Sequence, residues 1–198
     1  SDGTLPVNVK FIIEGEEESG GESIEAFVKN QSKQLSTDVV VVSDTSMVTT
    51  EQPAIITALR GGIAMELHVS GPSSDLHSGS YGGAVHNPAQ ALAEIIAQLH
   101  DADGHITVPG FYDDVKALTP EERNAIAQAG YDIDELQAET GISQAYGEPE
   151  FTILERVGAR PTLEITGIAG GYYGAGFKTV IPQKAIAKIS CRLVANQD

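Results

Sequence analysis

Near the start of the chain, an apolar run leads directly into a cluster of carboxylates. Val7–Ile13 is mostly apolar, a pattern that predicts a buried β-strand. Glu14, Glu16, Glu17 and Glu18 follow within five residues. Adjacent carboxylates repel one another unless a cation lies between them or one of them is protonated. The stretch therefore indicates either a divalent-metal site with a neighbouring general base or a solvated acidic turn before a helix.

A further acidic position follows the next predicted strand. Glu22–Lys33 has the apolar spacing of a short amphipathic helix, and Val39–Val42 is an apolar run that ends shortly before Asp44. Strand, helix and strand in this order predict a parallel βαβ unit with both strands buried. Because α/β sheets bind ligands beyond the carboxyl ends of their strands, we expect Glu17, Glu18 and Asp44 to share one rim.

The charge balance narrows the classes of partner. The chain has 28 acids against 12 Lys or Arg, and its formal net charge of −16 argues against binding nucleic acid or an anionic membrane surface. No apolar run reaches the roughly 18 residues of a membrane span. Cys191 is the single cysteine, so no disulfide can form within the chain. The start shows no signal-peptide pattern, and we expect a cytoplasmic protein.

Further along the chain the pattern changes from parallel to antiparallel. Ile63–Ser70 alternates apolar and polar residues, which predicts a strand with one face in water. Pro88–Leu99 has the spacing of a helix that Asn87 caps. Pro161–Gly167 and Ala185–Val194 are typical of further strands. The fold class predicted for the whole chain is α/β.

Six stretches, taken in order, resemble one protein family. It comprises the di-zinc metallopeptidases that include carnosinase-like dipeptidases, aminoacylases, succinyl-diaminopimelate desuccinylases and glutamate carboxypeptidases, and the dipeptidase branch is the most similar. Each stretch alone is weakly specific, but together they run from one end of the chain to the other. They are Glu14-Gly15-Glu16-Glu17-Glu18-Ser19-Gly20, Val42-Ser43-Asp44, Leu59-Arg60-Gly61, Asp75-Leu76-His77-Ser78-Gly79 with Tyr81-Gly82-Gly83, Lys178-Thr179-Val180-Ile181-Pro182, and Ser190-Cys191-Arg192-Leu193-Val194.

The resemblance implies a domain organisation. Residues 1–56 are expected to be part of the metal-binding catalytic domain and to contain the partial parallel βαβ unit. Residues 57–198 are expected to form an α+β lid, or dimerisation, domain with an antiparallel sheet, helices on one face and a helical insertion at about 101–150. The C-terminal part of this lid is expected to be missing, so the chain resembles an internal fragment of a longer enzyme.

The resemblance also implies catalytic roles. Glu17 corresponds to the general base that moves the protons of the reaction, and Glu18 and Asp44 correspond to metal ligands. His77 corresponds to a histidine that reaches the active site of the partner subunit and stabilises the oxyanion there. The implied reaction is hydrolysis of a peptide or amide bond by water bound to a dinuclear metal centre.

Substrate-binding residues follow from the same resemblance. Gly176, Lys178 and Thr179 belong to a glycine-rich stretch that matches a loop near the substrate carboxylate. Arg160 lies near the position of a family arginine that binds this carboxylate, but Arg160 is shifted by one residue from its place in the carnosinase pattern. Asn196 stands where some members carry a histidine.

The expected cofactors are two divalent metal ions, zinc or manganese, and the expected substrate is a small peptide or an N-acyl amino acid. Glu18 and Asp44 are present, but the family's earlier His-x-Asp pair and its late histidine have no counterpart in this chain. Two ligands are too few for a catalytic zinc pair. We therefore expect a homodimeric metallopeptidase as the parent protein and an inactive, metal-free fragment.

Two alternatives stay open from the sequence. In one, the chain is a non-catalytic dimerisation module and the acidic motif is vestigial. In the other, the parent is an N-acyl amino acid deacylase of the same family. The sequence separates dipeptidase from deacylase poorly, because specificity depends on loops and on parts of the family's site that this chain does not contain.

Overall fold

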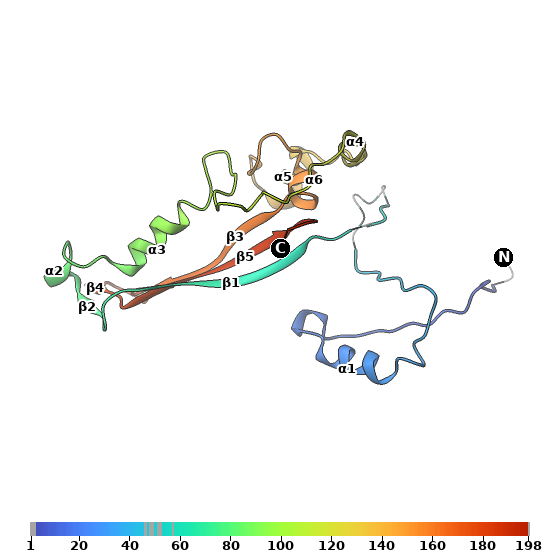
Figure 1. Cartoon of the computed structure of the whole chain (residues 1–198), viewed down its shortest axis with the longest axis horizontal. Coiled ribbons are helices and arrows are strands. Elements are labelled where there is room, and N and C mark those ends of the chain that lie inside the picture. Colours follow the sequence, from blue (N-terminus) through green and yellow to red (C-terminus); the bar gives the residue numbers. More distant parts are fainter. Residues whose placement is uncertain (1–2, 46, 48–49, 51–52, 57, 198) are drawn as a thin grey trace. The chain divides into compact units, whose positions relative to one another are not determined.

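The computed structural model describes residues 3–45, 47, 50, 53–56 and 58–197. The chain divides into two compact units, one that ends at Thr45 and one that follows it. The domain boundary predicted between residues 56 and 57 stays a prediction, since residue 57 lies outside the described residues. The elements, labelled in Figure 1, are η1 (Glu17–Ser19), α1 (Glu22–Asn30), β1 (Gly61–Ser70), β2 (Leu76–His77), α2 (Ser78–Tyr81), α3 (Pro88–Ile96), α4 (Pro120–Ala127), α5 (Ile133–Thr140), α6 (Ile153–Gly158), β3 (Thr162–Gly170), β4 (Val180–Ile181) and β5 (Lys184–Leu193).

The first unit contains the predicted helix, but its described residues form no β-strand. Helix α1 covers the first nine residues of the predicted amphipathic segment, and residues 31–33 at its end form a turn. The flanking segments 7–13 and 39–42 were predicted to be buried parallel strands, yet neither is a strand, and Ile13 and Val41 are 91% and 82% exposed. An apolar run indicates a need for burial, but a strand forms only where a neighbouring strand supplies hydrogen bonds. The described residues of this unit supply no such neighbour.

The second unit is built on a three-stranded antiparallel sheet with the order β1-β5-β3. The central strand is β5, and Ile63 of β1 and Leu163 of β3 both lie opposite Cys191. A β-bulge between Ile165 and Gly167 shifts the register of β3. The three strands coincide with the predicted ones, which confirms a mixed α/β fold with an antiparallel sheet.

Helix α3 covers part of one face of this sheet and lies along it in Figure 1, and residues from 99 to 112 pack on the rest of this face. Ala187 and Cys191 of β5 are 0% and 2% exposed, whereas Lys188 between them is exposed. Leu92 of α3 is 1% exposed and packs in one cluster with Ala185 and Ala187. The two-residue period of a strand sends alternate side chains to opposite faces, so one face is apolar and the other is in water, as predicted.

Helix α3 begins at the cap that the sequence predicted, and α4 and α5 also begin with side-chain caps. The Asn87 side chain accepts a hydrogen bond of 2.9 Å from the backbone N–H two residues later, at the start of α3. Thr119 and Asp132 begin α4 and α5 with capping boxes that Glu122 and Glu135 complete. Such caps satisfy backbone N–H groups that the helix itself leaves unpaired. No described helix is both long and apolar enough to cross a bilayer.

Two groups of small elements lie at opposite ends of the sheet in Figure 1. Helices α4, α5 and α6 gather at the end where β3 begins, and the predicted insertion contributes the first two of them. Strands β2 and β4 form a two-stranded antiparallel sheet at the other end, next to α2. This second end carries His77 and three of the residues predicted to bind substrate, Gly176, Lys178 and Thr179.

Candidate functional site

The acidic stretch forms a tight turn that presents two carboxylates next to each other. Glu17 and Glu18 begin the helix η1 and are both exposed. The Gly21 N–H donates to the Glu16 carbonyl at 3.0 Å, and the Ser23 N–H donates to the Glu16 carboxylate at 3.4 Å. Glu16 therefore ties the turn to the start of α1, and its own carboxylate has a structural partner.

Asp44 lies in the same unit and acts electrostatically on Glu17. The pKa of Glu17 is raised above its usual value, first by the charge of Glu18, then by desolvation and then by the charge of Asp44. Like charges disfavour the ionised form of a carboxyl group, which is why each neighbour raises the value. The fold thus brings near one another acids that the sequence places after two different apolar segments.

The carboxylates of Glu18 and Asp44 have suitable chemistry for a divalent cation, but they are too few. Carboxylate oxygens bind zinc and manganese, and a catalytic zinc takes about three protein ligands. Within the described residues, no third His, Cys, Asp or Glu joins this pair at the spacing that one ion requires. Among the described residues Glu18 and Asp44 are therefore not joined into a set of three ligands, and their role as metal ligands stays a prediction.

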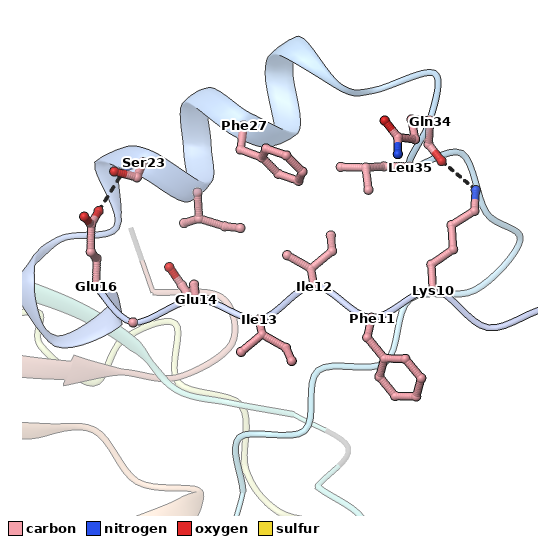
Figure 2. Close-up of a pocket in the computed structure, with 12 residues that line it drawn as sticks. Lys10, Phe11, Ile12, Ile13, Glu14, Glu16, Ser23, Phe27, Gln34 and Leu35 are labelled. Atoms are coloured by element: carbon pink, nitrogen blue, oxygen red, sulfur yellow. Dashed lines mark hydrogen bonds between the residues drawn. The ribbon is translucent and has the colours of Figure 1, made fainter.

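A hollow of about 640 Å³ lies beside the acidic turn, between α1 and the segment that precedes the turn. Figure 2 shows Ile12 pointing toward Phe27 of α1, whereas Ile13 points to the opposite side. The Lys10 ammonium donates to the Gln34 carbonyl at 2.6 Å at one end of the hollow. Apolar side chains on both sides of a segment are typical of a strand that is covered on both faces, which explains why the sequence predicted one.

His77 lies in the short β2–β4 pair. It is opposite Val180, and the neighbouring Ser78 N–H donates to the Thr179 carbonyl at 2.9 Å. The imidazole lies against Gly79, where an added Cβ would come within 2.8 Å of His77 Cε1. The pairing brings together His77 and Thr179, which were predicted from separate motifs. His77 is exposed to solvent.

The glycine-rich loop that leads into β4 contains Gly176 and Lys178. Gly176 has a φ of 80°, in the left-handed region that glycine adopts without strain. The Lys178 ammonium lies 4.7 Å from the ring centroid of Tyr172, whose hydroxyl donates to the Ala175 carbonyl at 2.8 Å. The sequence did not predict this contact of Tyr172, because a contact across a glycine-rich loop has no fixed sequence spacing.

The structure does not bring Arg160 or Asn196 to the His77 end of the sheet. Arg160 lies two residues before the start of β3, and its guanidinium donates to the Glu148 carboxylate through bonds of 2.6 and 2.7 Å. Asn196 adopts a φ of 74° in the turn after β5. The substrate roles of both residues stay predictions, and the occupied guanidinium and the turn geometry do not favour them.

The structure brings together a further set of possible metal-binding side chains, which the sequence did not predict. His105, Glu148 and Glu150 form the one set of three His, Cys, Asp or Glu side chains, within the described ranges, whose donor atoms all lie within 4.8 Å. His105 Nε2 is 3.0 Å from Glu150 Oε1, and both Glu148 oxygens accept bonds from Arg160. We interpret the set as part of an ion-pair network, because each member already has a hydrogen-bond partner within the set or in Arg160. His105 and Glu150 are 45 residues apart, a spacing that no local pattern reveals.

The chain is similar to known proteins in both sequence and structure. Residues 57–198 match the family described as the peptidase dimerisation domain, M20_dimer. Beta-Ala-His dipeptidase of Homo sapiens is 37% identical over 98% of this chain and 39% of its own length. Cys-Gly metallodipeptidase dug1 of Schizosaccharomyces pombe is 38% identical over 98% of this chain and 41% of its own. The crystal structure of human carnosine dipeptidase 1 matches with a TM-score of 0.81 at 36% identity, over 98% of this chain and 41% of that one. The chain thus spans about two fifths of the length of these relatives.

Proposed function

This chain belongs to the M20 peptidase dimerisation-domain family, and we propose that it is part of a metal-dependent dipeptidase. Residues 57–198 are the dimerisation domain, and the residues before them are a segment of the catalytic domain. The reaction is hydrolysis of the peptide bond of a small peptide. Because the relatives are more than twice as long as this chain, the activity belongs to a longer protein, which we call the complete enzyme.

The observation that carries this proposal is the extent of the similarity to proteins named as dipeptidases. It covers 98% of the chain, and so includes the acidic turn and Asp44 as well as the domain at 57–198. The two relatives are named for different dipeptides, so we propose a dipeptide as the substrate class and no particular pair of residues. Deacylation of N-acyl amino acids has no comparable support.

Glu17 is the general base in this proposal. Its exposed carboxylate takes the proton of the attacking water and returns it to the leaving amine. Glu18 and Asp44 would hold divalent metal, zinc or manganese, together with ligands from outside the described residues. Two such ions, when bound, polarise the scissile carbonyl and acidify water.

His77 acts in the active site of a second copy of the enzyme. The β2–β4 pair holds the histidine at an exposed end of the domain, where its imidazole can donate a hydrogen bond to the oxyanion of the partner's substrate. Gly176, Lys178 and Thr179 bind the substrate carboxylate near it. A homodimer is therefore part of the mechanism, in keeping with the description of the matched domain.

A cytoplasmic location completes the proposal. The buried free thiol of Cys191 is compatible with this location but does not decide it, because the chain has no second cysteine. The net charge of −16 disfavours nucleic acid as a partner.

The test is hydrolysis of a panel of dipeptides by the complete enzyme with added zinc or manganese. We expect turnover that Glu17→Gln lowers by about 10²-fold or more, since general-base catalysis contributes that much. Glu16→Gln is the matched control, because Glu16 has a structural partner in Ser23 and should leave turnover nearly unchanged. Absence of metal-dependent dipeptide hydrolysis by the complete enzyme would contradict the proposal.

A second candidate, a non-catalytic dimerisation module, is favoured by one observation. The described residues contain no complete metal centre at the acidic turn. The 198-residue chain alone should therefore form dimers without hydrolysing dipeptides. Analytical ultracentrifugation and the same dipeptide panel examine both expectations, and metal-dependent turnover by the chain alone would exclude the non-catalytic module.

A further inference from the structure

We propose that Tyr172 is a positioning residue that holds the Lys178 ammonium where it meets the carboxylate of the substrate. The inference rests on the proposed function, because it gives Tyr172 a part in recognising a dipeptide. It concerns how the glycine-rich loop before β4 is built.

Two contacts fix the Tyr172 side chain within this loop. Its hydroxyl donates to the Ala175 carbonyl at 2.8 Å. Its ring lies against Gly174, where an added Cβ would come within 2.6 Å of the hydroxyl and 2.8 Å of Cζ. Only glycine at position 174 lets the ring lie so close to the backbone. The loop therefore folds around the tyrosine ring, and the ring is in place before any ligand arrives.

The Lys178 ammonium lies over this fixed ring. The ammonium is 4.7 Å from the ring centroid, which is within the range of a cation–π contact. The chain has 28 acids for 12 Lys or Arg, yet Lys178 forms no ion pair with a carboxylate in the part of the chain that the structure describes. An aromatic face attracts an ammonium without neutralising its charge. The contact thus holds a positive charge in place and leaves it available to an anionic group.

The backbone links this charge to His77. The Val180 N–H donates to the Lys178 carbonyl at 3.0 Å, and the Ser78 N–H donates to the Thr179 carbonyl at 2.9 Å. Lys178 is therefore two residues from the position that pairs with His77 in the β2–β4 ladder. Tyr172 sets the direction of the ammonium relative to this ladder.

The neighbouring aromatic residues provide a matched comparison. Tyr173 and Phe177 are 94% and 104% exposed, whereas Tyr172 is 40% exposed. Neither of them forms an aromatic, cation–π or side-chain hydrogen-bond contact within the described structure. Tyr173→Leu therefore removes an aromatic ring from the same loop without removing the contact that we propose.

The kinetic test uses the complete enzyme. Tyr172→Leu should raise KM for a dipeptide about two- to fivefold, the effect of one exposed cation–π contact, and should change kcat less. Tyr172→Phe keeps the ring and should restore most of the affinity, while Tyr173→Leu should leave KM unchanged. An unchanged KM in Tyr172→Leu, or an equal rise in Tyr173→Leu, would overturn the inference.

Two further measurements separate positioning from a general structural effect. With a dipeptide whose carboxylate is amidated, Tyr172→Leu should no longer raise KM, because the charge that Lys178 meets is gone. In a Lys178→Gln background, Tyr172→Leu should likewise add nothing, as expected of two residues that act as a unit. Additive effects, or a KM rise that survives amidation, would show that Tyr172 acts otherwise.

The contact itself can be tested if the proposed function fails. In the 198-residue chain, NMR should find the ε-methylene protons of Lys178 shifted upfield by the Tyr172 ring, and Tyr172→Leu should abolish this shift. Absence of the shift in the unmodified chain overturns the inference even where dipeptides are hydrolysed. Presence of the shift in an enzyme that hydrolyses no dipeptide refutes the proposed function and confines the inference to the Tyr172–Lys178 contact.

Discussion

Arg160 and Glu148 form a bidentate salt bridge in which both side chains are largely buried, at 14% and 6% exposed. The guanidinium also lies 4.3 Å from the ring centroid of Phe151 and 5.1 Å from that of Tyr112. The pKa of Arg160 is raised, chiefly by its hydrogen bonds to Glu148. All these partners come from the region between α5 and β3 or from the insertion, so Arg160 joins the insertion to the sheet.

The first prediction concerns this pair. Arg160→Ala leaves the buried Glu148 carboxylate without a counter-charge and should lower the free energy of unfolding by about 3–5 kcal/mol. Urea denaturation of the chain measures the loss. Arg192→Ala is the control, because Arg192 is exposed and pairs with no described carboxylate, and it should stay within about 0.5 kcal/mol of the unmodified chain. Full stability in Arg160→Ala, with a higher KM in the complete enzyme, would instead favour the substrate role predicted from the sequence.

The second prediction concerns pH. The pKa of His105 is raised, first by its hydrogen bond to Glu150 and further by the charges of Glu150 and Asp101. The stabilisation from protonated His105 is therefore fully present below its ordinary pKa of 6.5 and is lost as the pH rises through the raised folded value. The pKa values of Glu150 and Asp101 are lowered. The stability that their ionised carboxylates contribute is therefore lost only as the pH falls through those lowered values.

Urea denaturation at about pH 5.5 and about pH 8.5 measures this dependence. His105→Gln should cost stability at the lower pH, and the difference from the unmodified chain should shrink at the higher one. Glu148 also faces this network, but its oxygens should stay bound to Arg160 when His105 is replaced. His100→Gln, which removes a histidine without an ion pair in the described structure, should show no such pH dependence. An equal loss at both pH values in His105→Gln would contradict the prediction.

The third prediction concerns the core between α3 and the sheet. Leu92 is 1% exposed and packs with Ala185 and Ala187, so Leu92→Ala leaves a cavity and should cost about 2–5 kcal/mol of unfolding free energy. Ile95 lies on the same helix but is 38% exposed, and Ile95→Ala should cost clearly less. Equal losses in the two variants would mean that α3 packs on the sheet through a different face.

Much of the second unit could be predicted from the sequence because its signals are local. Strand β1 alternates apolar and polar residues, and Thr119 and Asp132 cap their helices with residues three positions away. Such patterns report on the element itself. The antiparallel sheet and the beginning of α3 therefore lie where the patterns predict them, and α4 and α5 lie within the predicted helical insertion.

The features that the sequence did not predict depend on contact partners that lie far away in the sequence or outside the described residues. Segments 7–13 and 39–42 carry the composition of buried strands, but the described chain offers them no neighbouring strand. The bond between His105 and Glu150 joins residues 45 positions apart. Contacts of this kind become visible only when the chain is folded, and the same holds for the ring of Tyr172 over Gly174.

The last prediction concerns the histidine at the β2–β4 pair. A Cβ at Gly79 would come within 2.8 Å of His77 Cε1 and 3.1 Å of Nδ1, so Gly79→Ala should displace the imidazole. If His77 stabilises an oxyanion, this displacement should lower kcat of the complete enzyme by about tenfold or more while changing KM little. Gly158→Ala is the matched control, because nothing lies within 4 Å of its added Cβ and its φ is not in the left-handed region.

His77→Ala should lower kcat at least as far as Gly79→Ala does, and adding Gly79→Ala to it should have no further effect. An unchanged kcat in both single variants, measured on enzyme with an unaltered unfolding midpoint, would remove His77 from the reaction.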